Sequence, residues 1–373
     1  MKSTEENISK ILSIADIKIN GNRPWDLQIH NKKVYARVLN GGTLALGESY
    51  MDGWWDCNAI DQFTDKIVRA KLDKNVLSPS FIFDVVIARL FNRQKKSRAF
   101  EVGQRHYDVG NDLYKLMLDK RMVYTSGYWK NTKSLDEAQE AKLDLICRKI
   151  GLKKGMSVLD IGCGWGSFAK YAAEKYGAEV VGITVSKEQV ELANKLCKGL
   201  PIKIILQDYR DINTNKQFDR MVSIGMIEHV GPKNYQNYFE IIRKCLKDNG
   251  LFFLESFSAN WNTASQSDSW NDKYIFPNGT IPRLSQIINV TEKLFVIEDC
   301  HNFGSDYDKT LMAWHKKFID NYDKIKDIYD KRFFRMWTYY LLTFAGLFRS
   351  RKVQNWHIVF SKNGVNKGYN SIR

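Results

Sequence analysis

The sequence predicts an α/β protein with a doubly wound, mostly parallel, Rossmann-like sheet, preceded by a small and mainly helical N-terminal domain. Three observations lead to this prediction. From Met156 to Ser256, strand-like apolar runs alternate with amphipathic helix patterns. A glycine-rich loop, "GCGWG", directly follows the first of these strands. Residues 1–95 lack the alternation, and we place the domain boundary after residue 95.

The alternation places the expected elements in a definite order. The expected strands are 156–162, 178–185, 202–207, 218–225 and 251–256, and the expected helices are 167–177, 186–199 and 233–250. All three helices end in glycine, the residue that most readily closes a helix in the left-handed conformation. Beyond residue 260 we expect helices within 308–348 and a final strand, "WHIVFS", at 356–361. Ligands of such sheets bind beyond the carboxyl ends of the strands.

The N-terminal domain is expected to contain short helices around "LNGGTLALGESYMDGWWD". Within it, residues 79–93 combine apolar residues at helical spacing with basic residues at the end. Such a helix either lies on a lipid surface or packs against its own domain, and the pattern leaves both interpretations open. Residues 94–98, "QKKSR", are the expected linker to a catalytic domain that spans residues 96–373.

The 373-residue chain carries a net charge of +15, which suits contact with an anionic membrane surface or nucleic acid. Its basic clusters are short and no nucleic-acid module is recognisable, so we expect no nucleic-acid partner. No apolar run is long enough to span a bilayer, and the polar N-terminus does not resemble a signal peptide. The six cysteines are scattered, without a CxxC pair or a Cys/His cluster. We therefore expect reduced thiols, a cytoplasmic location and no metal site.

The glycines of the loop, Gly162, Gly164 and Gly166, would let backbone amides approach a ligand closely at a helix N-terminus. Either a dinucleotide or S-adenosylmethionine fits such a loop. Asp160 distinguishes them, because a carboxylate can hold the positively charged amino-acid end of S-adenosylmethionine but would repel a pyrophosphate. The second strand ends in "GITVS", without the acidic residue that NAD proteins place on the ribose. The loop therefore predicts an S-adenosylmethionine site in a class I methyltransferase fold.

Seven segments spread over nearly the whole chain carry a resemblance to a known family. They are "LGESYMDGWWD", "HYDVGNDLY", "VLDIGCGWG", "QDYRD", "GMIEHVGPKNY", "KYIFPNG" and "HNFGSDYDKTLMAW". In these motifs the chain resembles the cyclopropane-fatty-acyl-phospholipid synthases. The resemblance implies transfer of a methylene unit from S-adenosylmethionine to the cis double bond of an unsaturated acyl chain in a membrane phospholipid. It also implies a cytoplasmic, peripherally membrane-associated enzyme that is commonly a homodimer.

The resemblance assigns the cofactor contacts as well. They are Tyr124, Thr125, Asp160, Gly162, Gly164, Gly166, Thr184, Ser186, Gln189, Gln207 and Asp208. Gln207 and Asp208 would face the adenine. Their place at the end of the third expected strand favours a ligand role over that of an ordinary polar loop.

The implied chemistry needs a dry site that holds the alkene, a poor nucleophile, in line with the sulfonium methyl group. Methyl transfer leaves a carbocation on the acyl chain, which aromatic rings can stabilise. A base must then remove a proton from the new methyl group so that the ring closes. The aromatic candidates are Tyr124, Tyr128, Trp129, Tyr274, Phe276 and Tyr307. Most aromatic residues serve the core, so we expect only part of this set to line the site.

In the family, the base is understood to be a bicarbonate ion held by a Cys, a Glu, a His, a backbone amide and a Tyr. This chain keeps Glu228 and Tyr307 of that set. It departs from the set with Ser126 in place of the Cys, Glu255 in place of the His and Phe257 at the amide position. The resemblance therefore makes bicarbonate binding doubtful here.

Glu255 ends the apolar run "LFFLES", where a strand of this sheet would point into the ligand crevice. A second carboxylate beside Glu228 would repel an anion, and the pKa of one of the two groups should rise. We therefore hypothesise that no bicarbonate binds and that Glu255 is the base, with Glu228, Tyr307 and Ser126 around it. Two alternatives stay open: a C-methyltransferase acting on the same double bond, and a catalytically inactive lipid-binding homologue.

Overall fold

The computed structural model describes residues 4–72, 110–260 and 268–373. These residues form two compact units, each drawn from separate stretches of the chain. The sheet unit contains residues 110–260, 278–307 and 354–373, and the helical unit contains residues 4–72, 268–277 and 308–353. The expected amphipathic helix at 79–93 and the linker at 94–98 lie outside the described residues.

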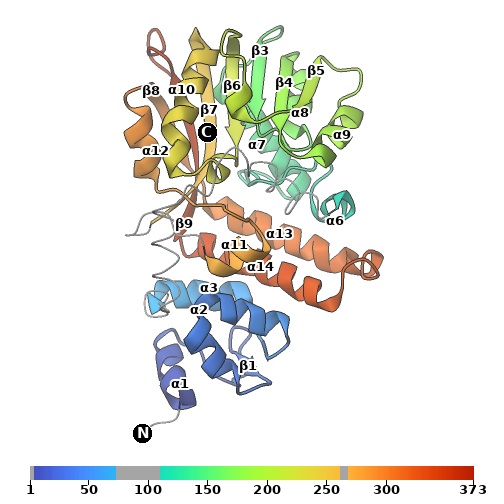
Figure 1. The fold of residues 1–373 in the computed structure, drawn as a ribbon, viewed down its shortest axis with the longest axis vertical. Coiled ribbons are helices and arrows are strands. Elements are labelled where there is room, and N and C mark those ends of the chain that lie inside the picture. Colours follow the sequence, from blue (N-terminus) through green and yellow to red (C-terminus); the bar gives the residue numbers. More distant parts are fainter. Residues whose placement is uncertain (1–3, 73–109, 261–267) are drawn as a thin grey trace. The chain divides into compact units, whose positions relative to one another are not determined.

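The sheet unit is built on seven strands in the order β5-β4-β3-β6-β7-β9-β8 (Figure 1). They are β3 (Ser157–Ile161), β4 (Glu179–Thr184), β5 (Ile202–Leu206), β6 (Phe218–Ile224), β7 (Leu246–Ala259), β8 (Val296–Asn302) and β9 (Val353–Ser361). The pairs β3–β4, β4–β5, β3–β6 and β6–β7 are parallel, whereas β8 and β9 are antiparallel to each other. The predicted mostly parallel sheet is confirmed.

Helices cover both faces of this sheet, because neighbouring residues of a strand point into two different cores. Val158 and Phe253 lie in one core with residues of α7 and α8, while Leu159 and Phe252 lie in the other with residues of α10. The helices of the unit are α6 (Asn111–Met117), α7 (Leu135–Lys149), α8 (Ser167–Tyr176), α9 (Lys187–Leu196), α10 (Tyr235–Cys245) and α12 (Leu284–Thr291). Short 3-10 turns occupy Tyr209–Asp211, Ile227–His229 and Pro232–Asn234.

The strand order determines where a ligand can bind. The chain proceeds from β3 to β4 and β5 in one direction, and then from β6 to β7 in the other. The connections therefore diverge between β3 and β6, which leaves a crevice at the carboxyl ends of these strands. Because the glycine loop follows β3, it lies at this point of divergence.

Two predicted helix ends are wrong: the helix expected to end at Gly199 ends at Leu196, and the larger difference concerns Gly250. The helix that we expected to end at Gly250 ends at Cys245, and β7 begins at Leu246. Leu246 pairs with Phe218 of β6, so a long-range strand pairing replaces the helix where the local pattern would continue it. Gly250 lies inside β7, whereas Gly177 ends α8 in the left-handed conformation as predicted, with φ of 65°.

The helical unit differs from the expected N-terminal domain, because helices from the second half of the chain join it. It comprises α1 (Thr4–Ile14), α2 (Val34–Met51), α3 (Ile60–Arg69), α11 (Ser269–Tyr274), most of α13 (Ser305–Asn321), the 3-10 turn Tyr322–Lys324, α14 (Lys331–Arg349) and the pair β1 (Gln28–Ile29) and β2 (Trp55–Asp56). A Cβ atom at Gly346 would lie 2.5 Å from the Asp61 carbonyl oxygen. Glycine therefore allows α14 to approach α3 closely, and a single boundary at residue 95 does not describe this unit.

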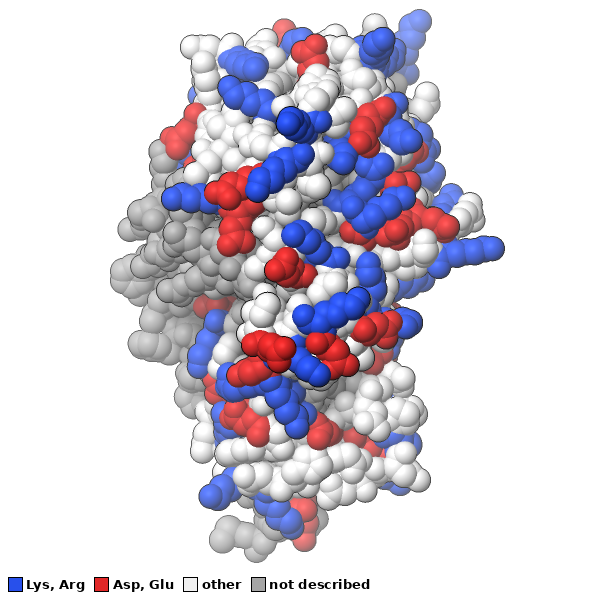
Figure 2. Space-filling model, turned by 90° about the vertical axis from the view of Figure 1, so that its right-hand side faces the viewer, with Lys and Arg blue, Asp and Glu red and all other residues white. Residues whose placement is uncertain are grey.

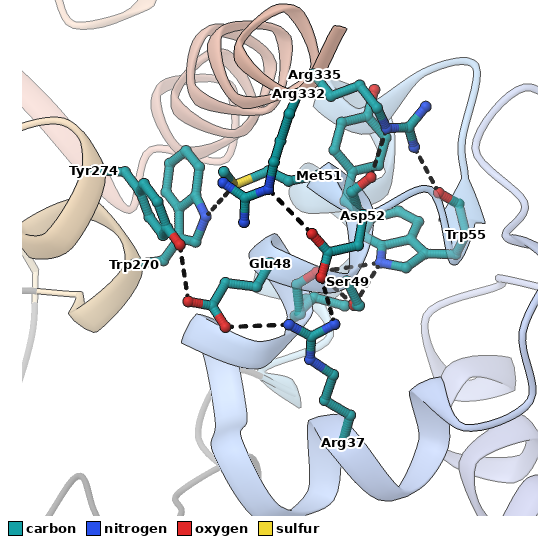
Figure 3. A network of polar contacts seen from close by, with 12 residues as sticks. Arg37, Glu48, Ser49, Met51, Asp52, Trp55, Trp270, Tyr274, Arg332 and Arg335 are labelled. Atoms are coloured by element: carbon teal, nitrogen blue, oxygen red, sulfur yellow. Dashed lines mark hydrogen bonds and ion pairs between the residues drawn. The ribbon is translucent and has the colours of Figure 1, made fainter. Parts of the chain in front are cut away.

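A polar network connects three helices of the helical unit (Figure 3). Arg37 of α2 binds Glu48 at 3.2 Å and Asp52 at 2.7 Å. Arg332 of α14 lies 3.2 Å from Asp52, and the Tyr274 hydroxyl of α11 donates to Glu48 at 2.9 Å. Each ion pair is partly exposed and contributes little alone, but together they connect segments far apart in the sequence.

The surface shows how the excess positive charge is distributed. On the face drawn in Figure 2, basic and acidic side chains are interspersed over the described atoms. The net charge of +15 is therefore not gathered into one basic patch on that face. Within residues 4–72, 110–260 and 268–373, no helix is long and apolar enough to cross a membrane.

Candidate active site

A cavity opens at the carboxyl ends of β3, β4, β5 and β6, within the sheet unit. Its walls come from the glycine loop, from the segments after β4, β5 and β6, and from the segment before α7. The predicted cofactor residues that line it are Tyr124, Thr125, Asp160, Gly162, Gly164, Thr184, Gln189, Gln207 and Asp208. Two others, Gly166 and Ser186, do not line it. The crevice expected from the strand order is thus where most of the predicted cofactor residues meet.

The three glycines of the loop all have positive φ, but they serve different purposes. A Cβ atom at Gly162 would lie 2.7 Å from the Met226 Cγ atom, and one at Gly166 would lie 3.1 Å from the Cys197 sulfur. Gly164 lines the cavity, and a Cβ atom there would meet no atom within 4 Å. Gly162 and Gly166 are therefore needed for packing, whereas Gly164 leaves its backbone open to a ligand.

Asp160 is the penultimate residue of β3 and is almost fully buried. Its Oδ2 atom has no hydrogen-bond partner among the described residues. Burial raises the pKa of Asp160 to about 7, and the positive charge of Lys142 opposes this rise. A buried carboxylate oxygen without a donor is unfavourable, so the site is suited to a cationic group from a ligand. The ammonium group of S-adenosylmethionine has that charge.

The turn after β4 holds Gln189 in a fixed orientation. The Thr184 hydroxyl donates to the Gln189 Oε1 atom at 2.7 Å, and the Gln189 backbone amide donates to the Ser186 hydroxyl at 3.2 Å. Ser186 is the N-cap of α9 and is buried. It begins the helix that presents Gln189.

The end of β5 supplies Gln207 and Asp208. The Gln207 backbone amide donates to the Thr184 carbonyl oxygen at 2.9 Å, which continues the pairing of β5 with β4 to the edge of the cavity. The Asp208 carboxylate accepts two hydrogen bonds from the Arg210 guanidinium, at 2.7 and 2.8 Å. Asp208 is therefore held rigidly before any ligand binds, as a preformed site requires.

Of the six aromatic residues proposed for the site, Tyr124 lines the cavity and the other five do not. Tyr128 packs edge-on against Phe303, with ring centroids 5.6 Å apart. Tyr274 and Phe276 belong to the helical unit. The sequence could not separate these residues from Tyr124, because aromatic side chains are equally common in protein cores.

Glu228 lies in the short turn Ile227–His229 that follows β6. Its Oε1 atom accepts hydrogen bonds from the Phe257 amide at 2.7 Å and the Ser256 hydroxyl at 3.3 Å, while Oε2 has no partner among the described residues. Burial raises the pKa of Glu228 to about 7, and the negative charge of Glu255 adds to the rise. The Phe257 ring packs edge-on against Tyr307 at 5.0 Å, so the structure brings these predicted residues together.

Glu255 lies near the end of β7, fully buried, and it does not line the cavity. Its carboxylate accepts from the Asn355 side-chain amide at 3.3 Å, contacts the His357 Nε2 atom at 3.2 Å and lies 3.8 Å from the Lys142 ammonium. Burial raises the pKa of Glu255, but Lys142, His357 and Asn355 together bring it below its ordinary value. A carboxylate held in this way does not fit the expected role of Glu255 as the base.

Ser126 is buried and donates its hydroxyl proton to the Gly127 carbonyl oxygen at 2.9 Å, without lining the cavity. The sequence pattern did not identify the residues that contact the Glu255 carboxylate. His357 lies within the expected final strand and Asn355 directly precedes it. Lys142 lies on the α7 face that also carries the buried residues Leu143 and Ile146. A lysine among buried helix positions was the signal that could have indicated a buried ion pair.

The doubly wound sheet, the glycine loop at its switch point and the unpartnered carboxylate beside it define a class I S-adenosylmethionine-dependent methyltransferase. The cavity wall and Asp160 suit this cofactor. A family model describes the chain more narrowly: the chain belongs to the mycolic acid cyclopropane synthetase family, which matches residues 94–358.

Individual relatives agree with this assignment. The chain is 50% identical over 368 residues to the cyclopropane-fatty-acyl-phospholipid synthase of Escherichia coli K12, a match that covers 98% of this chain and 95% of that protein. It is 34% identical to a probable fatty acid methyltransferase of Pseudomonas putida, over 72% of this chain and 70% of that protein. Among solved structures, the cyclopropane synthase MmaA2 from Mycobacterium tuberculosis is 27% identical with a TM-score of 0.66, covering 70% of this chain and 98% of that one.

Proposed function

We propose that this protein is a cyclopropane-fatty-acyl-phospholipid synthase, which transfers a methylene unit from S-adenosylmethionine to the cis double bond of an unsaturated phospholipid acyl chain. The observation that carries this proposal is the extent of its likeness to the Escherichia coli synthase. That likeness covers 98% of the chain and so includes both compact units, whereas the likeness to the fatty acid methyltransferase covers 72%.

A C-methyltransferase acting on the same double bond is the second candidate. It is favoured by the likeness to a probable fatty acid methyltransferase and by the altered base pocket, with Ser126 and Glu255 in place of the family's Cys and His. Both reactions begin with the same methyl transfer, and the product depends on which proton leaves the cation. The catalytically inactive homologue is disfavoured, because the cofactor cavity keeps nine of the predicted contacts.

In the proposed reaction, S-adenosylmethionine supplies an electrophilic methyl group when it is bound. Asp160 would hold its ammonium group, and Gln207 and Asp208 would face its adenine. The acyl-chain alkene would form a new carbon–carbon bond to the methyl carbon as the sulfonium–carbon bond breaks. Glu228 would then accept a proton from the new methyl group, and the remaining electron pair would close the ring.

We propose Glu228, in place of Glu255, as the base. Glu228 has a carboxylate oxygen without a partner among the described residues and a pKa raised to about 7, close to the pH at which a general base works best. Neither Glu228 nor Glu255 lines the cavity, but the turn that holds Glu228 contributes His229 to the cavity wall. Glu255 is instead committed to Lys142 and to two side chains of β9.

We further propose that the reaction does not depend on bicarbonate. The Phe257 amide, which occupies the position of an anion-binding amide in the family, donates to Glu228 at 2.7 Å. An anion would also meet the negative charges of Glu228 and Glu255. Activity in carefully degassed buffer is therefore expected to equal activity with added bicarbonate. A collapse that bicarbonate reverses would contradict this part of the proposal.

The proposed substrate requires peripheral association with a membrane, and we propose that the helical unit provides it, in a homodimeric enzyme. The support lies in apolar side chains that the unit exposes: Ile14 is 68% and Leu39 is 56% exposed. In a flotation assay with anionic vesicles at moderate salt, Ile14→Glu and Leu39→Glu should weaken binding. The control is Val296→Glu in the sheet unit, where the residue is 45% exposed. Equal binding by all variants would contradict the assignment.

The product distinguishes the two candidate functions. Phospholipids of cells that express the protein should gain one labelled methylene group from a labelled methyl donor. Because a ring and a methylated alkene can have equal mass, hydrogenation of the lipids must follow. A cyclopropane keeps its mass under mild hydrogenation, whereas a methylated alkene takes up two hydrogens. Absence of any labelled lipid would favour the inactive homologue.

A further inference from the structure

A fully buried lysine, Lys142 of α7, forms part of the cavity wall. Its ammonium group donates to the Thr125 hydroxyl at 2.6 Å, and Thr125 also lines the cavity. On its other side the ammonium lies 3.8 Å from the Glu255 carboxylate. Lys142 thus connects a cavity residue to a carboxylate that is itself outside the cavity.

Glu255 is well suited to hold this lysine in place. Its remaining contacts come from β9, where Asn355 donates to Oε1 at 3.3 Å and His357 contacts Oε2 at 3.2 Å. Burial lowers the pKa of His357 to about 4, so the ring is neutral at neutral pH and its Nε2–H donates to the carboxylate. With these donors Glu255 stays ionised in the protein interior and serves as the counter-charge of Lys142.

The charge of Lys142 also acts on Asp160, the expected partner of the cofactor's ammonium group. Among the described residues, Cys163, Cys197 and Tyr238 also interact electrostatically with Asp160. Burial raises the pKa of each of the three, so they are neutral at neutral pH. Among the described groups that face Asp160, Lys142 therefore supplies the positive charge.

Three further titratable groups lie near Lys142 or in the cavity wall: Asp208, His229 and Asp119. Asp208 is paired with Arg210 inside the cavity wall. Burial lowers the pKa of His229 to about 4, so this cavity residue is neutral. Asp119 also faces Lys142, and its carboxylate accepts hydrogen bonds from the Val123 and Arg121 amides.

We propose that Lys142 is a positioning residue for the methyl-donor site: anchored by Glu255, it orients the Thr125 hydroxyl and places a positive charge in the cavity wall that also contains Asp160. The inference deepens the proposed function and rests on it only for the identity of the donor. It also gives a reason for a glutamate at position 255, where the family has a histidine. Glu255 balances the charge of Lys142 in the protein interior, where both side chains are fully buried.

The consequence is a defined dependence of cofactor affinity on pH. In the empty protein the pKa of Asp160 is raised to about 7, so affinity for an ammonium ligand should rise as the pH rises through that value and then level off. A neighbouring opposite charge lowers a carboxyl pKa by about 1 to 3. Removing the lysine charge should therefore move this rise to a pH higher by about one unit or more, with a roughly tenfold loss of affinity at pH 6.5.

The experiment is calorimetric titration of the full chain with S-adenosylhomocysteine from pH 5.5 to 9. Lys142→Met removes the charge with little change in length. It should move the acidic limb of the affinity profile, which is the pH range where affinity rises, to higher pH. The double variant Lys142→Met with Glu255→Gln removes both charges of the pair. It should melt at a higher temperature than the single variant, because no carboxylate is left without a counter-charge, yet keep the displaced limb.

A matched control lies on the same helix. Lys149 is also buried and also pairs with a carboxylate, Asp299, but it does not line the cavity. Lys149→Met should lower the melting temperature and leave the affinity profile of the wild type unchanged. This separates a positioning role from the general loss of a buried ion pair.

Three outcomes would overturn the inference. The first is an unchanged acidic limb in Lys142→Met or, if that variant does not fold, in the double variant. The second is an equal displacement of the limb in Lys149→Met. The third is failure of the wild type to bind S-adenosylhomocysteine at any pH, which would overturn the proposed function too. The first two would leave the proposed function intact.

Discussion

Replacing Glu228 by glutamine is expected to stabilise the protein at alkaline pH and to abolish turnover. The residue is 6% exposed, and its Oε2 atom has no partner among the described residues. Burial, assisted by the charge of Glu255, raises its pKa from 4.5 to about 7. Glutamine has nearly the same shape, keeps an acceptor for the Phe257 amide and has no charge. It therefore removes the unfavourable buried charge and the proton acceptor together.

The sign and the size of the effect follow from linkage between protonation and folding. Because the pKa is higher in the folded state, stability falls as the pH rises from about 4.5 to about 7 and is then constant. A difference of about 2.5 between two pKa values corresponds to roughly 3 kcal/mol. The glutamine variant should recover this amount at pH 8 and almost none at pH 4.5. For a unit of this size, it amounts to roughly 6 to 12 °C in melting temperature.

The assay is the melting temperature of the cofactor-free protein at pH 5 and pH 8, measured by calorimetry alongside turnover. Asp299→Asn is a control of opposite sign. Although burial raises the pKa of Asp299, Arg373 and Lys149 bring it well below its ordinary value. Stability from this group is therefore present at neutral pH and is lost in acid. The control should be less stable than the wild type by a similar amount at pH 5 and at pH 8, because both values lie above the ordinary Asp pKa of 3.8.

Two results would contradict this prediction: a glutamine variant that melts no higher than the wild type at pH 8, or one whose increase in melting temperature is the same at pH 5 as at pH 8. In either case the carboxylate does not carry the burial penalty inferred here. If stability behaves as expected but turnover persists, Glu228 is not the base, although the electrostatic argument stands.

Two further predictions concern glycines. Gly164→Ala should lower stability by about 1 to 2 kcal/mol, because φ is 55°, and should weaken S-adenosylhomocysteine binding at least about tenfold by occupying the cavity wall. Gly155→Ala is the control, because Gly155 has φ of 77° and a Cβ atom there would meet no atom within 4 Å. It should lose similar stability without losing affinity. Equal affinities in the two variants would show that Gly164 has no special place in the binding site. Gly346→Ala should lower the melting temperature, because the added methyl group overpacks against Asp61. Overpacking costs about 1 to 3 kcal/mol of stability, of which improved helix propensity returns about 1 kcal/mol. An unchanged melting temperature would show that α14 and α3 can separate freely.

The sheet and its cofactor loop could be predicted because their signals are local. Alternating apolar patterns, the glycines after the first strand and Asp160 at its end lie within a few residues of one another. Short-range sterics and charge therefore determine what they can form. Cavity-lining positions at the strand ends, such as Gln207, followed directly from the rule that ligands bind at those ends.

The end of α10 depends on a long-range contact that the local sequence pattern does not reveal. The pattern up to Gly250 is compatible with a helix, and only the pairing of Leu246 with Phe218 of β6 makes strand the better solution. The helical unit gives a second case. Gly346 and Arg332 carry no local sign that they contact Asp61 of α3 and Asp52 after α2, which precede them by more than two hundred residues. Such contacts depend on the three-dimensional path of the chain.

Glu255 shows most clearly what the sequence determined and what only the tertiary structure decided. The sequence by itself determined that a carboxylate would end a central strand near Glu228, and that one of the two groups would have a raised pKa. Only the tertiary structure decided which one. Lys142, Asn355 and His357 approach Glu255 from α7 and β9 and lower its pKa, whereas burial of Glu228 outweighs its hydrogen bonds from Phe257 and Ser256 and raises its pKa. The physical reason is that the pKa of a buried carboxylate depends on the groups within a few ångströms, and here folding brings them from a hundred or more residues away on either side.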